Sequence, residues 1–244
     1  MKIRSNSLHF THCLQLKNNE IGNPVYDLSN GLIAQLESAD QVLLLRRAKL
    51  VTLNVGEVLS VSDAANSIIY FPVSGAIALY AGRQNEGASV GMAVGLVGAE
   101  GAAGLQAALG FGAGNLKLVV QSAGQAYAVD SAVAQRLVQR RRSMLLKFSR
   151  YLWSIFDSIA VLASKPYTQD IKVRLADWLL LSAQRCAPDP LVLTHAQIGQ
   201  MLGVRRASVS IAAHELKLKR YISYSRGRIA LLNVPALESM AQGQ

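Results

Sequence analysis

The sequence predicts an α+β protein with a β-rich N-terminal domain, a long helix and a C-terminal winged helix-turn-helix. Three observations support this fold. Short alternating runs separated by glycine-bearing turns fill residues 49–130. Apolar residues recur at helical spacing after Ser131, and two short helical segments flank Gly203. With 244 residues, 51% of them hydrophobic, the chain is long enough to bury two modest cores.

The charge of the chain lies in its C-terminal half. Residues 1–130 hold 8 Lys/Arg and 9 Asp/Glu, whereas residues 131–244 hold 17 Lys/Arg and 6 Asp/Glu, so the second half carries all of the net +10. A positive field confined to one half is typical of a module that binds a polyanion such as nucleic acid. An anionic membrane surface would explain the charge equally well.

Membrane and export signals are missing from the sequence. No run approaches the roughly 18 apolar residues of a membrane span, and the first residues lack the apolar core of a signal peptide. Cys13 and Cys186 are too few and too far apart for a disulfide framework or a four-thiolate metal site. We therefore expect a cytoplasmic, reduced protein that does not bind membranes.

The N-terminal segment divides into an arm and a short helical stretch. Residues 1–24 show little periodicity and predict a loosely ordered arm. His9, His12 and Cys13 within it are competent metal or haem ligands, but no other ligand cluster supports them, so we expect no metal site. The leucine spacing in residues 27–47 predicts one or two short helices.

Residues 25–130 predict a sandwich or roll of short strands. Apolar runs recur about every 8–12 residues, and Gly56 and Gly75 mark turns between them. Pro72 suits the edge of a sheet because it cannot donate to a strand ladder. The glycine-rich stretch 95–114 lacks the Lys-Ser/Thr ending of a phosphate-binding loop, so it predicts turns and a short helix.

Residues 131–164 predict a long dimerisation helix. Its apolar positions alternate in steps of three and four, as in the seam of a coiled coil. The six seam residues are Leu145, Phe148, Leu152, Ile155, Ile159 and Leu162. The seam must be buried, either against the chain's own β-domain alone or also against a second copy, and we expect self-association alongside packing. Lys165-Pro166 predicts the end of this helix. The run Arg140–Arg142 is either a solvated helix face or a supplementary electrostatic surface.

Residues 165–244 predict the winged helix-turn-helix. A helix starting at Asp170 stops near Cys186. Thr194 is placed to cap a short helix over 195–202, Gly203 supplies a tight turn, and a second helix runs from about Arg205 to Lys219. Residues 221–224 and 228–232 predict paired strands, the wing, joined at Arg226-Gly227.

The N-terminal end of the second helix is the end that enters the major groove in such motifs. We predict that Arg206 reads a guanine through two parallel donors, that Arg205 and Ser208 contact phosphate, and that Ser210 is a second base contact. At the wing, Arg226 and Arg228 are either phosphate contacts or solvated turn residues. Thr194 completes the predicted set of DNA-contacting residues.

The stretch from Gln197 to Ser210 resembles the helix-turn-helix of the Crp/Fnr family, the cyclic-AMP receptor protein and its relatives. The segments 70–75 and 97–105 resemble a bacterial subgroup of the same family. The resemblance implies a cyclic-nucleotide-binding-type roll, which is a double-stranded β-helix or jelly roll, followed by a dimerisation helix. It also implies a cytoplasmic homodimer that binds a near-palindromic double-stranded operator, with RNA polymerase as a candidate further partner.

The sequence departs from the family pattern at the sensor. Members that bind cyclic AMP follow a Gly-Glu turn with an Arg-Ser or Arg-Thr pair, and the arginine meets the cyclic phosphate. The comparable region 110–121 offers Asn115 and Lys117 but no arginine, which argues against cyclic-AMP binding in the usual manner. Two cysteines exclude the four-cysteine iron–sulfur sensor. Ala207 stands where many members have an acidic base reader, so the operator should differ at that base pair.

We therefore predict a transcription regulator that is either modulated by an unidentified effector or constitutive. Two other classes of protein are alternatives. One is a small-molecule or nucleotide sensor that acts mainly through protein partners. The other is an enzyme, which the sequence does not favour because it shows no Ser/His/Asp arrangement, no metalloprotease helix and no clustered carboxylates.

Overall fold

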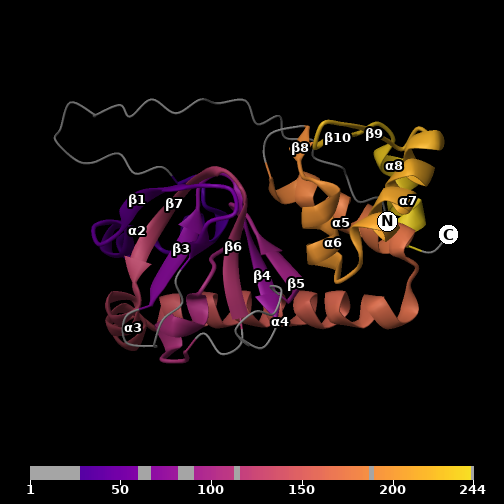
Figure 1. Cartoon of the computed structure of the whole chain (residues 1–244). Coiled ribbons are helices and arrows are strands. Elements are labelled where there is room, and N and C mark those ends of the chain that lie inside the picture. The colour runs from indigo at the N-terminus through magenta and orange to yellow at the C-terminus, as the bar shows by residue number, and fades with distance from the viewer. Residues whose placement is uncertain (1–27, 60–66, 82–90, 113–115, 187–189, 243–244) are drawn as a thin grey trace, which may run out of the picture.

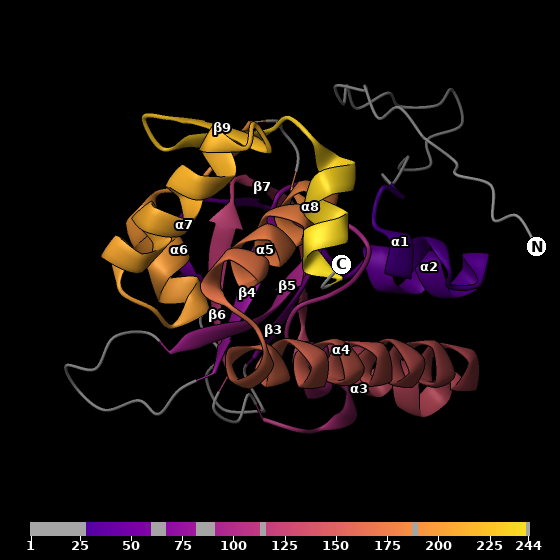
Figure 2. The same ribbon diagram turned by 90° about the vertical axis from the view of Figure 1, so that its right-hand side faces the viewer.

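The computed structural model describes residues 28–59, 67–81, 91–112, 116–186 and 190–242 (Figure 1). The arm over 1–24, with His9, His12 and Cys13, and also Asn115 lie outside these residues. The chain forms a β-domain lying along one long helix, with a smaller helical domain packed beside it near the far end of that helix (Figures 1 and 2).

Two short helices, α1 (Gly31–Ala34) and α2 (Ser38–Leu45), precede the β-domain and confirm the helical prediction. The carboxamide oxygen of Asn30 caps α1 by accepting from the amide of Ile33, and its nitrogen donates to the carbonyls of Pro72 and Gly101 at 2.8 and 2.7 Å. This fully buried amide therefore fixes the entering chain to the β-domain.

The β-domain consists of two antiparallel sheets. The first has the order β1-β7-β3 and the second the order β2-β6-β4-β5. The strands are β1 (Lys49–Leu53), β2 (Val58–Leu59), β3 (Ile68–Pro72), β4 (Ala76–Ala81), β5 (Met92–Val97), β6 (Leu116–Ser122) and β7 (Gly124–Asp130). Leu53 and Ala126 of the first sheet share a core with Ile77 and Leu118 of the second, which confirms the predicted roll. Pro72 ends an edge strand as expected, and a single 3-10 turn, η1 (Leu105–Leu109), lies in the glycine-rich stretch.

The helical segment after the roll is broken, contrary to the single helix predicted over 131–164. It forms α3 (Ser131–Arg140) and α4 (Arg142–Thr168), with Arg141 extended between them. The Arg141 guanidinium lies 2.5 Å from the buried carboxylate of Asp40, which also accepts from the Ser143 hydroxyl at 2.7 Å. This ion pair holds the break, so Arg141 belongs neither to a solvated face nor to a free basic surface.

The prediction that the long helix ends at Lys165-Pro166 is wrong, because α4 continues to Thr168. Pro166 cannot donate to the carbonyl four residues earlier, so α4 lacks one backbone hydrogen bond there but does not end. The Lys165 carbonyl still accepts from the amide of Gln169 at 2.9 Å.

The C-terminal domain contains the predicted helix-turn-helix and wing. It comprises α5 (Ile171–Arg185), β8 (Leu191–Val192), α6 (His195–Leu202), α7 (Arg206–Leu218), β9 (Ile222–Ser225), β10 (Arg228–Leu231) and α8 (Val234–Ala241). Strand β10 lies between β8 and β9 in a small sheet. The sequence does not predict β8 or α8, since a two-residue strand and an eight-residue helix carry little periodicity.

The two domains share a hydrophobic core. Tyr80 and Leu96 of the roll are buried together with Leu175, Trp178 and Leu179 of α5. The C-terminal domain is therefore packed against the β4-β5-β6 face of the roll, and its position depends on contacts that span the two domains (Figure 1).

One buried arginine ties the roll to the helix-turn-helix. Arg174 of α5, only 9% exposed, donates to the carbonyl of Leu202 at the end of α6. Its Nη2 also lies 4.0 Å from the sulfur of Met92 on β5. Burial lowers the pKa of this guanidinium from its ordinary value.

Candidate DNA-binding surface and neighbouring cavities

The turn between α6 and α7 is built as the sequence predicts. Thr194 caps α6 in a capping box, accepting from the Gln197 amide at 3.2 Å, while the Gln197 side chain accepts from the Thr194 amide at 2.9 Å. Gly203 ends the helix with φ +66°, a conformation that favours glycine. A Cβ at Gly199 would lie 2.9 Å from the carbonyl oxygen of Val204, so this glycine lets the two helices approach closely.

Helix α7 has an inner and an outer face. Val209, Ala212, Ala213 and Leu216 are buried against the rest of the domain. Arg206, Ala207 and His214 are exposed on the other side, together with Ile211, which is 65% exposed. Arg205, the N-cap residue, is also exposed. The outer face therefore presents two cations at the start of α7 and an apolar patch, Ala207 and Ile211, beside them.

Ser210 is engaged within the domain. Its hydroxyl donates to the Arg206 carbonyl at 3.1 Å, and its oxygen lies 2.9 Å from Nδ1 of His195. The imidazole of His195 stacks on Tyr224 of the wing with ring centroids 4.1 Å apart. His195 therefore links α6, α7 and the wing. Burial, with a smaller effect from the charge of Arg206, lowers the pKa of its imidazole.

The remaining predicted contacts lie at the wing and around α7. Arg226 and Gly227, with φ +47° and +75°, form the tight turn between β9 and β10. The side chains of Arg226 and Arg228 are exposed there, Ser208 is half-buried on α7, and Thr194 is exposed with its hydroxyl donating to Gln197 Oε1 at 2.8 Å. The structure thus brings the predicted residues together on the C-terminal domain.

Sequence reasoning missed Ile211. The helical period could have revealed it, because Ala207, Ile211 and His214 recur at steps of four and three on the face opposite the buried residues. Ser210, predicted as a second base contact, is half-buried, and its hydroxyl donates to the Arg206 carbonyl.

The predicted seam of α4 faces the chain's own domains. Phe148 is fully buried in the roll core, 6.1 Å from the ring of Phe71. Leu145 and Leu152 pack around the same core, Ile155 and Ile159 pack on the second core of the roll, and Leu162 packs on the core of the C-terminal domain. In this conformation Phe148 offers no surface to a partner, so the dimerisation role of the seam stays a prediction.

A second apolar stripe of α4 is exposed. It consists of Leu146, Trp153, Phe156 and Ala160, and we refer to it as the outer stripe of α4. The spacing of seven, three and four residues keeps these side chains on one face. The rings of Trp153 and Phe156 stack with centroids 5.4 Å apart, and Trp153 is 70% exposed.

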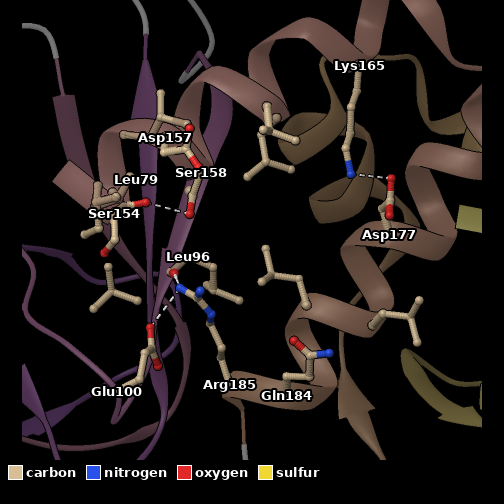
Figure 3. A pocket seen from close by; sticks show the side chains of 18 of the residues that line it. Leu79, Leu96, Glu100, Ser154, Asp157, Ser158, Lys165, Asp177, Gln184 and Arg185 are labelled. Carbon is tan, nitrogen blue, oxygen red and sulfur yellow. Dashed lines mark hydrogen bonds and ion pairs between the residues drawn. The ribbon is translucent and has the colours of Figure 1, made fainter. Parts of the chain in front are cut away.

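Two of the cavities that adjoin α4 lie beside or between the two domains. The roll cavity holds about 160 Å³ and is lined almost wholly by apolar residues such as Leu105, Leu118 and Phe156, with Gln106 as a polar side chain at its wall. The junction cavity, about 560 Å³, lies between β5, α4 and α5, where the two domains meet (Figure 3). Among the described residues, no group of three His, Cys, Asp or Glu could hold a metal ion, and no helix has the length and hydropathy to cross a membrane.

Comparison with known proteins bears on this geometry. Residues 173–240 match the family model of the Crp-like helix-turn-helix domain. A Crp-like helix-turn-helix domain is joined here to a Crp/Fnr-type fold. A putative Crp/Fnr-family transcriptional regulator from Eubacterium rectale shares that fold, with a TM-score of 0.66 at 14% identity, covering 88% of this chain and 100% of the other.

Two further solved structures agree with this Crp/Fnr fold. FixK2 from Bradyrhizobium japonicum gives a TM-score of 0.63 at 16% identity, covering 79% of this chain and 96% of the other. A CRP/FNR-family regulator from Thermus thermophilus gives 0.61 at 19% identity, covering 80% and 98%. No curated protein matches the sequence. The roll is thus a cyclic-nucleotide-binding-like domain, and the whole described architecture is that of Crp/Fnr transcriptional regulators.

Proposed function

We propose that this Crp/Fnr-type chain is a sequence-specific transcription regulator that binds a near-palindromic operator as a homodimer. The observation that carries the proposal is the exposed N-terminal end of α7, where Arg205 and Arg206 form no ion pair with any described residue. Such a helix end enters the major groove in helix-turn-helix proteins. The positive excess of the C-terminal half supplies attraction to the phosphates.

The outer stripe of α4 is the proposed dimer contact. Trp153 and Phe156 expose large rings next to the small Ala160, so a second copy of the helix can approach closely. Exposed aromatic side chains of this size are typical of interfaces. This assignment moves the predicted contact from the seam to a neighbouring face of α4, because the seam packs on its own chain.

The outer face of α7 suggests which bases are read. Arg206 has the two donors that match O6 and N7 of guanine. Ala207 and Ile211 flank it with methyl groups, and apolar side chains recognise the C5-methyl group of thymine in the major groove. We expect each half-site to pair one guanine contact with neighbouring thymines, while Arg205, Ser208, Thr194, Arg226 and Arg228 serve the backbone.

The roll cavity is a poor match to a cyclic nucleotide. Ligand pockets usually hold about 300–1,000 Å³, whereas this cavity holds about 160 Å³, and no cation is present among the described residues that line it. A cyclic phosphate buried there would meet no opposite charge from these residues. We therefore propose that a cyclic nucleotide is not the effector, and we assign no catalytic activity to the chain.

Selection of binding sites from random duplex DNA, without added ligand, tests the proposal. A two-fold symmetric sequence should emerge, with half-sites roughly 34 Å apart. Replacing each selected thymine by deoxyuridine removes only its methyl group. The affinity of the parent chain should fall when the replaced thymine faces Ile211. The same replacement should leave the affinity of the Ile211→Ser variant unchanged. Weak, steeply salt-dependent binding without a preferred sequence would contradict the proposal.

A further inference from the structure

The junction cavity belongs to both domains at once. Its walls are β5 and Glu100 of the roll, the C-terminal half of α4, and α5 of the C-terminal domain (Figure 3). At about 560 Å³ it falls within the usual range for small-molecule sites. A ligand in it would touch both domains, so its binding would depend on how they are arranged.

The body of the cavity is apolar. Leu96, Ile155, Ile159, Leu162 and Leu181 line it from all three sides. A ligand that fills this space must therefore have an apolar body, because a polar one would lose its hydration without replacement.

Both cations in the cavity wall are already paired. Arg185 lies 2.8 Å from a carboxylate oxygen of Glu100 and also donates to the carbonyl of Leu96. Lys165 lies 2.5 Å from the carboxylate of Asp177 (Figure 3). The charges of both cations are therefore offset by neighbouring carboxylates, which would repel an anionic ligand that approached either cation.

The α4 wall offers several acceptors beside one unpartnered donor, the hydroxyl of Tyr151. The Ser154 hydroxyl donates to the carbonyl of Tyr151 and the Ser158 hydroxyl to the carbonyl of Ser154, both at 2.8 Å, so their oxygens retain free lone pairs. The carboxylate of Asp157 stands between them in sequence and lines the same wall. The lining of the whole cavity contains three carboxylates, Glu100, Asp157 and Asp177, and the two cations Lys165 and Arg185. The lining as a whole therefore carries a net negative charge.

We propose that the junction cavity binds a small organic cation, an apolar body bearing a protonated amine, and that this ligand modulates DNA binding. The amine would donate to Asp157 and the two serine oxygens while its body fills the apolar space. The expected effect of this ligand on DNA affinity rests on the proposed function, whereas the binding of the ligand to the cavity does not.

Calorimetric titration of the full chain with two matched probes tests the site. One probe is 2-phenylethylamine, a cation, and the other is 3-phenylpropionate, an anion with a similar body. The amine should bind at least about tenfold more tightly, as expected for a charge-assisted hydrogen bond. Asp157→Lys should abolish amine binding, while the matched reversal Glu238→Lys, at an exposed position of α8 outside the cavity lining, should leave it unchanged.

The outcomes separate the site from the proposed function. Tighter binding of the propionate, no binding of the amine, or amine binding that survives Asp157→Lys would each overturn the proposed site. Amine binding that shifts the affinity for the selected operator, and fails to do so in Asp157→Lys, supports the whole proposal. Amine binding by a protein that prefers no DNA sequence would leave the cavity assigned and overturn the proposed function instead.

Discussion

Truncation of Trp153 to alanine should weaken the proposed homodimer through the outer stripe of α4. A tryptophan side chain presents about 250 Å², and Trp153 leaves 70% of its surface exposed in the single chain. If a partner covers half of that exposed area, roughly 90 Å² at about 25 cal/mol/Å² gives about 2 kcal/mol per copy. Both copies change, so the dimer should lose about 4 kcal/mol, or close to a thousandfold in Kd.

Sedimentation equilibrium of the purified chain measures this constant directly. Phe111→Ala is the matched control, because Phe111 is 65% exposed but lies after η1, away from the outer stripe. The control should leave the dimer intact. Equal dissociation constants for Trp153→Ala, Phe111→Ala and the parent chain would refute the assignment of the outer stripe as the dimer contact.

Three further predictions concern the DNA-binding domain and the helical break. Arg206→Lys keeps the charge but loses the paired donors, so discrimination at one base pair per half-site should fall by about 1–3 kcal/mol in binding assays with altered sites. A uniform loss of affinity for all DNA sequences would indicate a phosphate contact instead. Asp40→Asn removes the buried partner of Arg141 and should cost about 2–3 kcal/mol in urea unfolding, and a change within experimental error would exclude a structural role for the pair. Because burial and Arg206 lower the pKa of His195, its stabilising effect is complete above the unfolded value of 6.5 and is lost as pH falls below it. Stability of the parent chain should therefore decline between about pH 7 and pH 5, and an unchanged slope in His195→Gln would assign that decline to other groups.

Local signals in the sequence determined the C-terminal motif. Thr194, Gly199 and Gly203 each meet a requirement set by their own helix or turn, namely a cap, a close approach and a left-handed backbone. Such requirements depend on a few neighbouring residues, so they can be recognised without the tertiary structure. Arg226 and Gly227, which have positive φ in the turn of the wing, likewise meet a requirement set by their own turn.

The sequence predicted that the N-terminal domain is a roll of short strands, but it did not predict which strands pair. Alternating runs and glycine turns indicated many short strands, yet nothing local in the sequence specified that β7 lies between β1 and β3. Strand order depends on contacts between residues far apart in the chain, because the backbone hydrogen bonds between strands are the same whichever residues form them. The helical break at Arg141 has the same origin, since its partner Asp40 lies 101 residues earlier.

The sequence by itself determined the class of fold, the helix-turn-helix and the lack of the arginine that a cyclic nucleotide needs. Only the tertiary structure decided which side of α4 is free, that Ile211 rather than Ser210 faces outward, and that the larger cavity lies between the domains. Periodicity shows that a helix has apolar positions, but which of them find partners depends on what the rest of the chain packs against them. Phe148 and Trp153 illustrate this, because both are aromatic residues of one helix and one is buried while the other is exposed.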